Sequence, residues 1–283
     1  YVISPLFFPG GNIGELAVHG TVNDLAVSGA KPLYLSCGMI IEAGFPTDSL
    51  RKIVKSMKRA ADEAGVKIVT GDTKVVHRGA ADQLFINTAG VGVIRSGISM
   101  SAQKIQVGDS IIVNGYLGDH GAAILLARKE LDIQAEIESD TQALNGLVDT
   151  ILDVCMEVRA MRDVTRGGLA TVLNEFAMSS KVGIRLFEKK LPVREKVSAV
   201  CEILGLDPLY FANEGKLVTV VPPDKADTVL KAMQSHPAGI DSAIVGEVFA
   251  PPSGSLGLVC LKNKFDTERV IDMLTGDQLP RIC

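Results

Sequence analysis

Stretches of helical periodicity alternate with strand-like stretches along the whole chain. In the first third, apolar residues recur every three or four positions over 14–29 and 48–65, which predicts two helices. Gly65 is expected at the C′ position of the second helix. Apolar runs of strand length flank these helices, at 33–41, 66–70 and 83–94. This part of the chain therefore predicts a mixed helix and strand unit.

A polar, turn-forming stretch at 101–110 precedes a second unit in which the alternation resumes. The helices expected there are 120–131, 141–155, one opening at 165–168, 193–205 and 226–235. The expected strands are 110–115, 216–221, 242–248 and 256–261. The predicted fold class is α+β, with mixed sheets flanked by helices. We expect two domains, 1–107 and 108–274, and a flexible C-terminal tail, 275–283.

Composition narrows the classes of function. Hydrophobic residues make up 47% of the 283 residues, so the chain can bury a core and is not of the disordered type. Charges of both signs are mixed along the length, with a net charge of −4, which argues against a nucleic-acid or anionic-membrane partner. The apolar runs are too short for a membrane span.

The 5 cysteines are widely spaced and form no C-x-x-C pair, which argues against zinc spacings and a disulfide scaffold. Reduced thiols in the cytoplasm are the plain interpretation. The chain opens at Tyr1, in the middle of an expected strand, so we expect the natural amino terminus to lie upstream.

A glycine-rich loop, FFPGGNIG, leads into the first helix. Gly10, Gly11 and Asn12 are candidate phosphate contacts, because such loops let backbone N–H groups approach an anion at a helix N-terminus. The loop matches neither the P-loop nor the dinucleotide fingerprint. A tight turn between a strand and a helix is an equally good interpretation.

Three polar residues interrupt the apolar pattern of that helix. His19 and Asn23 lie four apart and share a face, with Asp24 alongside. Such side chains are costly to bury without partners, and a metal or phosphate site would supply them. A solvated helix face is the alternative, and for His19 alone it is the better one.

The stretch GDTK places Asp72, Thr73 and Lys74 in an expected turn at the end of a buried strand. A carboxylate, a hydroxyl and an ammonium group on one turn suit Mg²⁺ and phosphate. Strand ends are common ligand sites in layered α/β structures. A plain β-turn also explains Gly-Asp-Thr.

The strongest local pattern is RDVTRGG. Asp163, Thr165 and two glycines introduce a helix whose N-terminus is available to an anion, and Arg166 adds a fixed positive charge. A helix cap explains the aspartate or the threonine, but it gives no reason for Arg-Gly-Gly.

Two further stretches carry titratable groups. Asn213 and Glu214 precede a buried strand in FANEGKLV, and carboxylates in partly apolar surroundings suit the role of a general base. A solvated turn is the commoner explanation for this stretch alone. GDHGAA resembles another helix entry, with His120 near its N-cap.

The chain ends in TGDQLPRIC, with Cys283 as its last residue. Pro280 favours an extended chain, and Arg281 favours the thiolate while the terminal carboxylate opposes it. Prenylation is excluded because its motif places the cysteine four residues from the end. From these residues alone, an incidental terminal cysteine is the commoner explanation.

Taken together, these stretches resemble the HypE family of hydrogenase maturation factors, within the PurM-like superfamily of aminoimidazole ribonucleotide (AIR) synthetase and selenophosphate synthetase. The resemblance covers nearly the whole chain, and the combination of GDTK, ANEG and a terminal PRIC is its most specific part. Family members carry an additional amino-terminal segment ending in an acidic strand. The implied architecture is a PurM-like ATP-binding and dimerisation domain followed by a PurM-like C-terminal domain.

The resemblance implies an activity. A partner carbamoyltransferase, HypF, would load a carbamoyl group on the sulfur of Cys283. ATP-dependent dehydration would then turn this thiocarboxamide into a thiocyanate, and the cyano group would pass to iron on a HypC–HypD scaffold, as a ligand for nickel–iron hydrogenases. The resemblance also implies a homodimer joined through the first domains, with nucleotide near that interface.

Each candidate residue receives a role from this resemblance. Asp24, Asp72 and Asp163 would bind Mg²⁺ and place the phosphates of ATP. The nucleotide-binding candidates are Gly10, Gly11, Asn12, His19, Asn23, Thr73, Arg166 and Asn213. Glu214 is the candidate base near the amide nitrogen, Lys74 a relay or charge stabiliser, and Cys283 the acceptor and carrier.

Two alternatives remain at this point. One is an ATP-dependent synthetase or kinase of the same superfamily that acts on a small diffusible molecule. The other is a non-catalytic carrier whose cysteine holds a group made elsewhere. Selenophosphate synthesis would lead us to expect a reactive Cys or selenocysteine near the amino terminus, and no such residue appears in the part of the amino terminus that this sequence retains. A carrier has no need of the polar residues in GDTK and ANEG.

Overall fold

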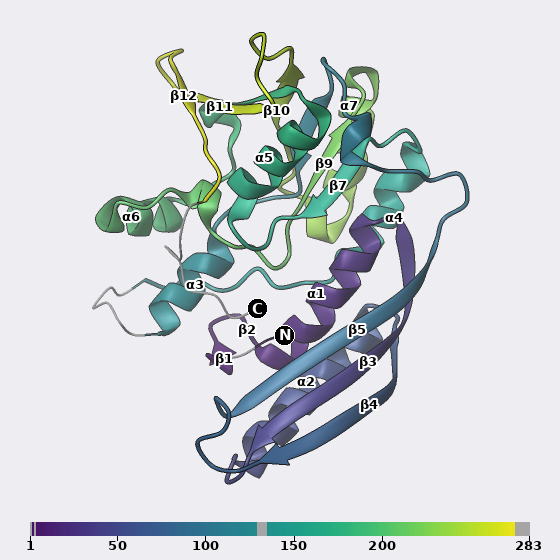
Figure 1. Ribbon diagram of the computed structural model, residues 1–283, viewed down its shortest axis with the longest axis vertical. Coiled ribbons are helices and arrows are strands. Elements are labelled where there is room, and N and C mark those ends of the chain that lie inside the picture. The colour runs from purple at the N-terminus through teal and green to yellow at the C-terminus, as the bar shows by residue number, and fades with distance from the viewer. Residues whose placement is uncertain (1, 3, 129–134, 275–283) are drawn as a thin grey trace.

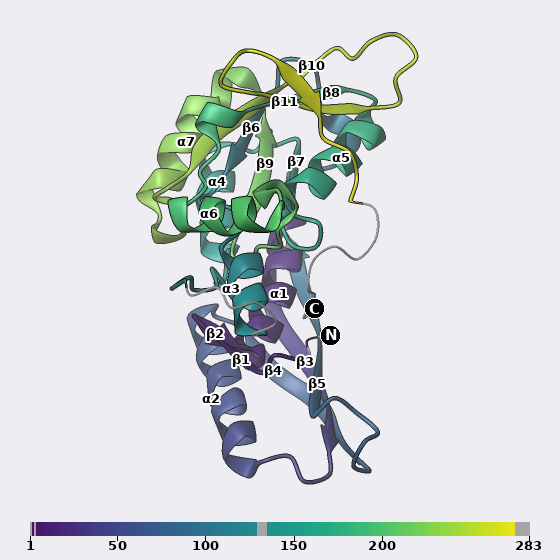
Figure 2. The same cartoon turned by 90° about the vertical axis from the view of Figure 1, so that its left-hand side faces the viewer.

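The computed structural model describes residues 2, 4–128 and 135–274. Two sheets, each with its own helices, lie end to end along the long axis of the molecule (Figures 1 and 2). Helix α1 (Ile13–Val27) runs from the smaller sheet towards the larger one (Figure 1). Within the described ranges, no helix combines the length and the apolar character needed to cross a membrane.

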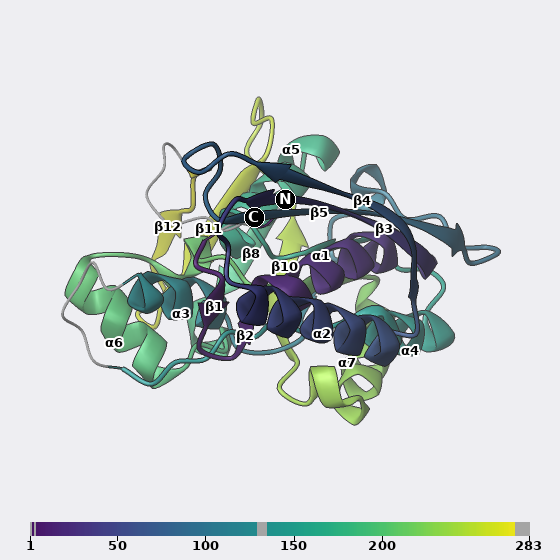
Figure 3. The same cartoon turned by 90° about the horizontal axis from the view of Figure 1, so that it is seen from below.

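The first part is built on a three-stranded sheet in the order β4-β3-β5, with β3 parallel to β4 and antiparallel to β5. Its elements after the short hairpin β1 (Phe7–Phe8) and β2 (Gly11–Asn12) are α1, β3 (Ala30–Glu42), α2 (Thr47–Glu63), β4 (Lys67–Val76) and β5 (Leu84–Ile94). Helices α1 and α2 cover one face of this sheet (Figure 3). Their apolar side chains pack against β3 and β5, so one face of these two strands is largely buried and the other is left open, whereas the edge strand β4 is exposed along nearly all of its length.

The second part is built on a seven-stranded mixed sheet in the order β12-β11-β8-β10-β6-β9-β7. Its strands are β6 (Ser110–Val113), β7 (Ala160–Asp163), β8 (Gly183–Phe187), β9 (Leu217–Val221), β10 (Ala243–Phe249), β11 (Leu258–Lys262) and β12 (Glu268–Val270). Its helices are α3 (Asp119–Ala127), α4 (Asn145–Val154), α5 (Gly168–Ser180), α6 (Glu195–Leu204) and α7 (Ala226–Ser235). Short 3-10 helices are at Ala102–Lys104, Glu188–Lys190, Pro208–Tyr210, Pro223–Lys225 and Pro237–Gly239.

The two faces of the seven-stranded sheet carry different helices. Apolar residues of α5 pack with Ile111, Val113 and Val220 on one face. Helices α4 and α7 pack with Ile112 and Val221 on the other, together with the last turn of α1. Because both faces of β9 are covered, all five of its residues are buried, and all but Thr219 are apolar.

The predicted α+β class, with mixed sheets flanked by helices, is confirmed. Three strands, β7, β8 and β12, were not expected, and the predicted start of one helix is wrong. Strand β7 was not expected, because it has four residues and Arg162 interrupts its apolar pattern. Helix α4 begins at Asn145 rather than at 141, and the backbone before it bonds to Asn23 of α1 instead: the Gln142 carbonyl oxygen accepts from the Asn23 amide, and the Leu144 N–H donates to it.

Candidate functional site

The stretch FANEG lies at the junction of the two parts, just before β9. Asn213 is 0% exposed, and its side chain accepts a hydrogen bond from the Gly118 backbone N–H at 2.7 Å. The same amide donates to the carbonyl oxygens of Val164 at 3.0 Å and Phe211 at 2.9 Å. Asn213 thus ties three chain segments together, and all of its amide groups are used in doing so.

Glu214 is buried, with 3% of its surface exposed, and its carboxylate lies beside His120 of α3. Oε1 of Glu214 is 4.0 Å from Nε2 of His120, whose Nδ1 is hydrogen-bonded to Oγ of Ser139 at 2.8 Å. Burial lowers the pKa of His120 to about 4, against the opposing charge of Asp140. At neutral pH His120 is therefore a neutral imidazole beside the Glu214 side chain.

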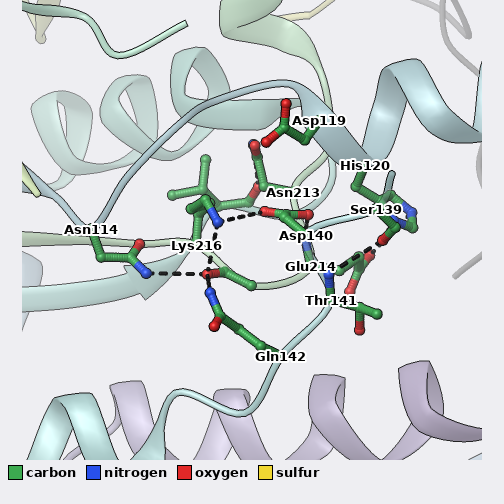
Figure 4. Close-up of polar contacts among 12 residues, drawn as sticks. Asn114, Asp119, His120, Ser139, Asp140, Thr141, Gln142, Asn213, Glu214 and Lys216 are labelled. Atoms are coloured by element: carbon green, nitrogen blue, oxygen red, sulfur yellow. Dashed lines mark hydrogen bonds and ion pairs between the residues drawn. The ribbon is translucent and has the colours of Figure 1, made fainter. Parts of the chain in front are cut away.

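Side chains of Asp140, Gln142 and Asn114 hold the backbone at Glu214 and Gly215 (Figure 4), and Asn23 of α1 adds a contact from the first part of the molecule. The Glu214 N–H donates to Oδ1 of Asp140 at 3.0 Å, and its carbonyl oxygen accepts from Asn23 of α1 at 3.2 Å. The carbonyl oxygen of Gly215 accepts from Gln142 at 3.0 Å. A general base needs a fixed position, and these contacts provide one.

The three polar residues of α1 lie in two different environments. His19 and Asn23 are buried and face the segment 139–144: Nδ1 of His19 is 3.0 Å from Oγ1 of Thr141, and Asn23 accepts from the Leu144 N–H at 2.8 Å. Burial, together with the charge of Arg59, lowers the pKa of His19 to about 4. Both residues connect the two parts of the chain, and their nucleotide-binding role stays a prediction.

Asp24 is exposed at the end of α1 and lies near Asp163, the last residue of β7. Although the residue is exposed, the protein around it partly desolvates its carboxylate and so raises the pKa of Asp24; the Asp163 carboxylate raises it further, while Arg162 and Arg166 oppose the shift. Two carboxylates that repel each other in this way form a suitable place for a cation. Thus α1 and β7 bring together two of the three predicted metal ligands, and Arg166 lies on the same side.

The two glycines of RDVTRGG have a structural explanation. Gly167 and Gly168 have φ values of +73° and +62°, a backbone region that glycine enters freely. A Cβ on Gly168 would lie 2.3 Å from the carbonyl oxygen of Leu209. The glycines are therefore required by the entry into α5, so the expectation that a structural reading gives no reason for them is wrong. Arg166 is exposed in this turn.

The glycine-rich loop forms the hairpin β1–β2 and the cap of α1. Gly10 has a φ of +86°, and a Cβ there would lie 2.7 Å from the Ser139 backbone nitrogen. Asn12 caps α1 by accepting from the Gly14 N–H at 2.9 Å, and the Glu15 carboxylate accepts from the Asn12 N–H at 3.0 Å. The interpretation as a tight turn accounts for Gly10, Gly11 and Asn12, and their contact with phosphate stays a prediction.

The expected turn at GDTK does not exist. Asp72, Thr73 and Lys74 lie within the edge strand β4, whose pairing with β3 continues to Val76, and all three are exposed. Gly-Asp-Thr is typical of turns, but the long partner strand β3 keeps the chain extended here. Side chains alternate along a strand, so Thr73 points to the face opposite to Asp72 and Lys74. Thr73, with Asp72 beside it, lines a cavity of about 940 Å³ between α2 and β4.

The three predicted metal ligands do not form one site within a single chain. Among the residues that the structure describes, no group of three or more His, Cys, Asp or Glu side chains is arranged to hold a metal ion. Asp72 therefore does not complete a three-carboxylate site with Asp24 and Asp163 within a single subunit. Cys283 lies outside the described residues.

The described cysteines are poor nucleophiles. Cys37, Cys155, Cys201 and Cys260 are all buried, and burial raises the pKa of each thiol, to about 11 for Cys201 and Cys260. A thiol needs its thiolate form and access to its reaction partner. The structure therefore offers no reactive thiol among the described cysteines.

Two charged residues of the junction were not predicted. Asp140 and Lys216 form an ion pair, with Nζ of Lys216 3.2 Å from Oδ2 of Asp140. Lys216 lies in the quoted stretch FANEGKLV, two positions after Glu214, and only its burial sets it apart from a surface lysine. Asp140 belongs to a polar run that carries no periodicity, so no pattern in the sequence pointed to it.

Comparison with known proteins places this geometry in a family. The family models for the N-terminal and C-terminal domains of AIR synthase related proteins match residues 1–94 and 106–259. Carbamoyl dehydratase HypE of Azotobacter vinelandii is 53% identical over 283 residues, which are 100% of this chain and 82% of that protein.

The chain belongs to the HypE family. Among solved structures, a hydrogenase maturation protein HypE in complex with ATP matches with a TM-score of 0.95 and 47% identity, over 100% of this chain and 85% of the other. A HypE–HypF complex matches with a TM-score of 0.93 and 48% identity, over 97% of this chain and 88% of the other. The predicted family and its PurM-like fold are confirmed.

Proposed function

We propose that the chain is an ATP-dependent carbamoyl dehydratase acting on a carbamoyl group carried by its own Cys283. The observation that carries this proposal is the buried Glu214 carboxylate beside a neutral His120, fixed at the junction of the two parts. The name of the A. vinelandii HypE and the ATP and HypF in the solved complexes support it.

Dehydration of a thiocarboxamide needs a leaving group on oxygen and a base at nitrogen. Transfer of the γ-phosphoryl group of ATP to the amide oxygen, with loss of one N–H proton, supplies the leaving group. Glu214 then accepts the second N–H proton while the C–O bond breaks, phosphate departs and the C≡N bond forms. Because His120 is neutral, it adds no positive charge that would make the carboxylate a weaker base.

Asp24 and Asp163 would hold a Mg²⁺ ion, because their repulsion raises the pKa of Asp24 and a cation relieves it. A bound Mg²⁺ supplies charge neutralisation at the phosphates of ATP. Arg166, exposed on the same side, would add a guanidinium contact to a phosphate oxygen. These three residues come from α1, from β7 and from the turn before α5, so the site depends on the junction.

The open face of the three-stranded sheet is the proposed homodimer interface. Tyr34, Val91 and Val93 are 46%, 62% and 61% exposed and share this face. By the register of β3 with β4, Asp72 and Lys74 lie on the same face. Apolar patches of this kind mark contact surfaces. Dimerisation would bring Asp72 and Lys74 near the nucleotide, which explains why they are exposed in a single chain.

The remaining partners and the location follow from the activity. HypF would load the carbamoyl group, and a HypC–HypD complex would receive the cyano group on iron. The reduced thiol of Cys283 fits the cytoplasm. The proposal keeps the division into domains 1–107 and 108–274 with a tail at 275–283, because these exchanges require Cys283 to meet several partners.

Substitution of the terminal cysteine tests the proposal. With HypF, carbamoyl phosphate and ATP, the parent should gain a carbamoyl group and then a thiocyanate, while Cys283→Ala should gain neither. Cys201→Ala is the matched control, because this buried thiol, with a pKa of about 11, should not take part. Mass spectrometry of the intact protein reads both adducts. Modification of Cys283→Ala to the parental extent would contradict the proposal.

A further inference from the structure

The segment 139–142 connects the candidate base with both parts of the molecule. We infer that Asp140, paired with Lys216, is a positioning residue for Glu214: it fixes the peptide from which the base projects. This inference rests on the proposed function, since it concerns the dehydration step. It assigns a role to a buried ion pair that the mechanism above does not use.

The geometry joins the pair directly to the base. One carboxylate oxygen of Asp140, Oδ1, accepts the Glu214 N–H at 3.0 Å, and the other, Oδ2, lies 3.2 Å from Nζ of Lys216 (Figure 4). The neighbouring residue Ser139 holds the His120 ring at 2.8 Å. The same short segment thus sets the positions of both members of the Glu214–His120 pair.

Close packing leaves this segment little freedom. A Cβ on Gly215 would lie 1.9 Å from the carbonyl oxygen of Asp140, so the two backbones are in contact. Asn114 and Gln142 donate to the Gly215 carbonyl oxygen at 3.1 Å and 3.0 Å. With its backbone held on both sides, Glu214 would enter the reaction already in place.

The burial of the Asp140–Lys216 pair indicates that it fixes the position of Glu214 rather than stabilising the fold. The side chains of Lys216 and Asp140 are only 9% and 4% exposed. Removing two charges from water costs about as much free energy as their attraction returns, so such pairs add little net stability. A buried carboxylate that binds the N–H of the catalytic residue instead limits where that residue can be. Displacement of a reacting group by about 1 Å can slow a reaction by about 100-fold.

Asp109 offers a matched control within the chain. It is 1% exposed, accepts the Gln106 N–H at 2.7 Å and pairs with Arg159 at 3.4 Å. It therefore has the same three features as Asp140: burial, a backbone N–H and a cationic partner. It has no contact with Glu214 among the described interactions, so Asp109→Ala measures the general cost of losing such a carboxylate.

The experiment measures single-turnover dehydration on full-length protein whose Cys283 has first been carbamoylated. Asp140→Ala should slow this step by about 10- to 100-fold, with carbamoyl uptake and the KM for ATP unchanged. Asp140→Asn keeps an oxygen for the Glu214 N–H and should stay within about threefold of the parent. Asp109→Ala should match the parent per folded molecule.

An equal rate for Asp140→Ala and Asp109→Ala would overturn the inference, and so would an Asp140→Asn variant as slow as Asp140→Ala. If Asp140→Ala does not fold, Lys216→Met serves instead, because it frees the Asp140 carboxylate from its partner. It should slow the step by about tenfold, and a parental rate would overturn the inference. Failure of the parent itself to dehydrate its tail would count against the proposed function, which is a different result.

Discussion

The stretches around Glu214 and around Asp72 looked alike in sequence but differ in the folded chain. Asn213 and Glu214 are buried at the junction, where each has partners on other segments. Asp72 and Lys74 lie exposed on an edge strand, where the Asp72 carboxylate accepts only its neighbouring Thr73 N–H among the described contacts. The described contacts of the first stretch lie within a single chain, whereas the side chains of the second are left exposed. We propose that a homodimer and nucleotide supply partners for the second stretch.

The largest expected effect concerns the buried stretch. Glu214→Gln preserves size but removes the ability to accept a proton, so dehydration should slow by about 10²- to 10⁴-fold. Carbamoyl uptake at Cys283 should be unchanged, because it does not require this base. Mass spectrometry of the tail distinguishes the two steps. Dehydration at the parental rate would remove Glu214 from the role of base.

Stability should show the same contrast. Asn213→Ala removes a side chain that binds three segments and leaves buried polar groups unpaired, at a cost of about 2–4 kcal/mol in the free energy of unfolding. Thr73→Ala on the exposed strand should change it by no more than about 0.5 kcal/mol. Urea unfolding of both variants checks the pair of values. Equal losses would show that burial does not separate the two stretches.

Acid should weaken the junction. The pKa values of His19 and His120 are about 4 in the folded chain and 6.5 in the ordinary case, so the unfolded chain binds more protons between these values. The contribution of the two neutral histidines to the free energy of unfolding is therefore fully present above pH 6.5 and is lost as the pH falls towards 4. From pH 7 to pH 5 it amounts to about 2 kcal/mol for each histidine. His120→Gln should flatten the pH dependence of urea unfolding. His77→Gln, at an exposed position directly after β4, is the control and should leave that dependence unchanged. An unchanged pH dependence for His120→Gln would contradict this account.

The smallest expected effect concerns the open sheet face. Val91→Glu places a charge on the proposed interface and should weaken dimerisation by at least tenfold, or about 1.4 kcal/mol. Lys74→Met removes a charge from the same face and should leave the dimer intact. Light scattering over a dilution series measures both. A parent that is monomeric at all concentrations would break the explanation given for Asp72 and Lys74.

The sequence predicted helices and strands better than it predicted the three-dimensional environment of individual residues. Helix α2 and the buried strand β9 followed from their apolar periods, because period reports directly which face meets the core. GDTK was misplaced because turn-forming residues were judged alone, while the pairing with β3 that keeps β4 extended spans about 35 residues of chain, from Gly38 to Asp72. Local composition cannot report such long-range pairing.

The same limit applies to the site. Glu214 was singled out because the family resemblance gave ANEG a meaning, and its burial then supported the choice. Asp140 was missed because its importance lies in contacts with residues more than 70 positions away, at Glu214 and Lys216. Arg-Gly-Gly was given a purely functional reason because the close approach of Gly168 to Leu209 is visible only in three dimensions.

The central claim is that this chain dehydrates a group bound to its own terminal cysteine. The most direct test is mass spectrometry of the purified full-length protein with a carbamoylated tail, before and after addition of ATP and Mg²⁺. The account predicts that the tail peptide ending in Cys283 loses the mass of one water, with one ADP formed for each molecule converted. ATP consumption without that loss, or a tail that keeps its carbamoyl group unchanged, would contradict it.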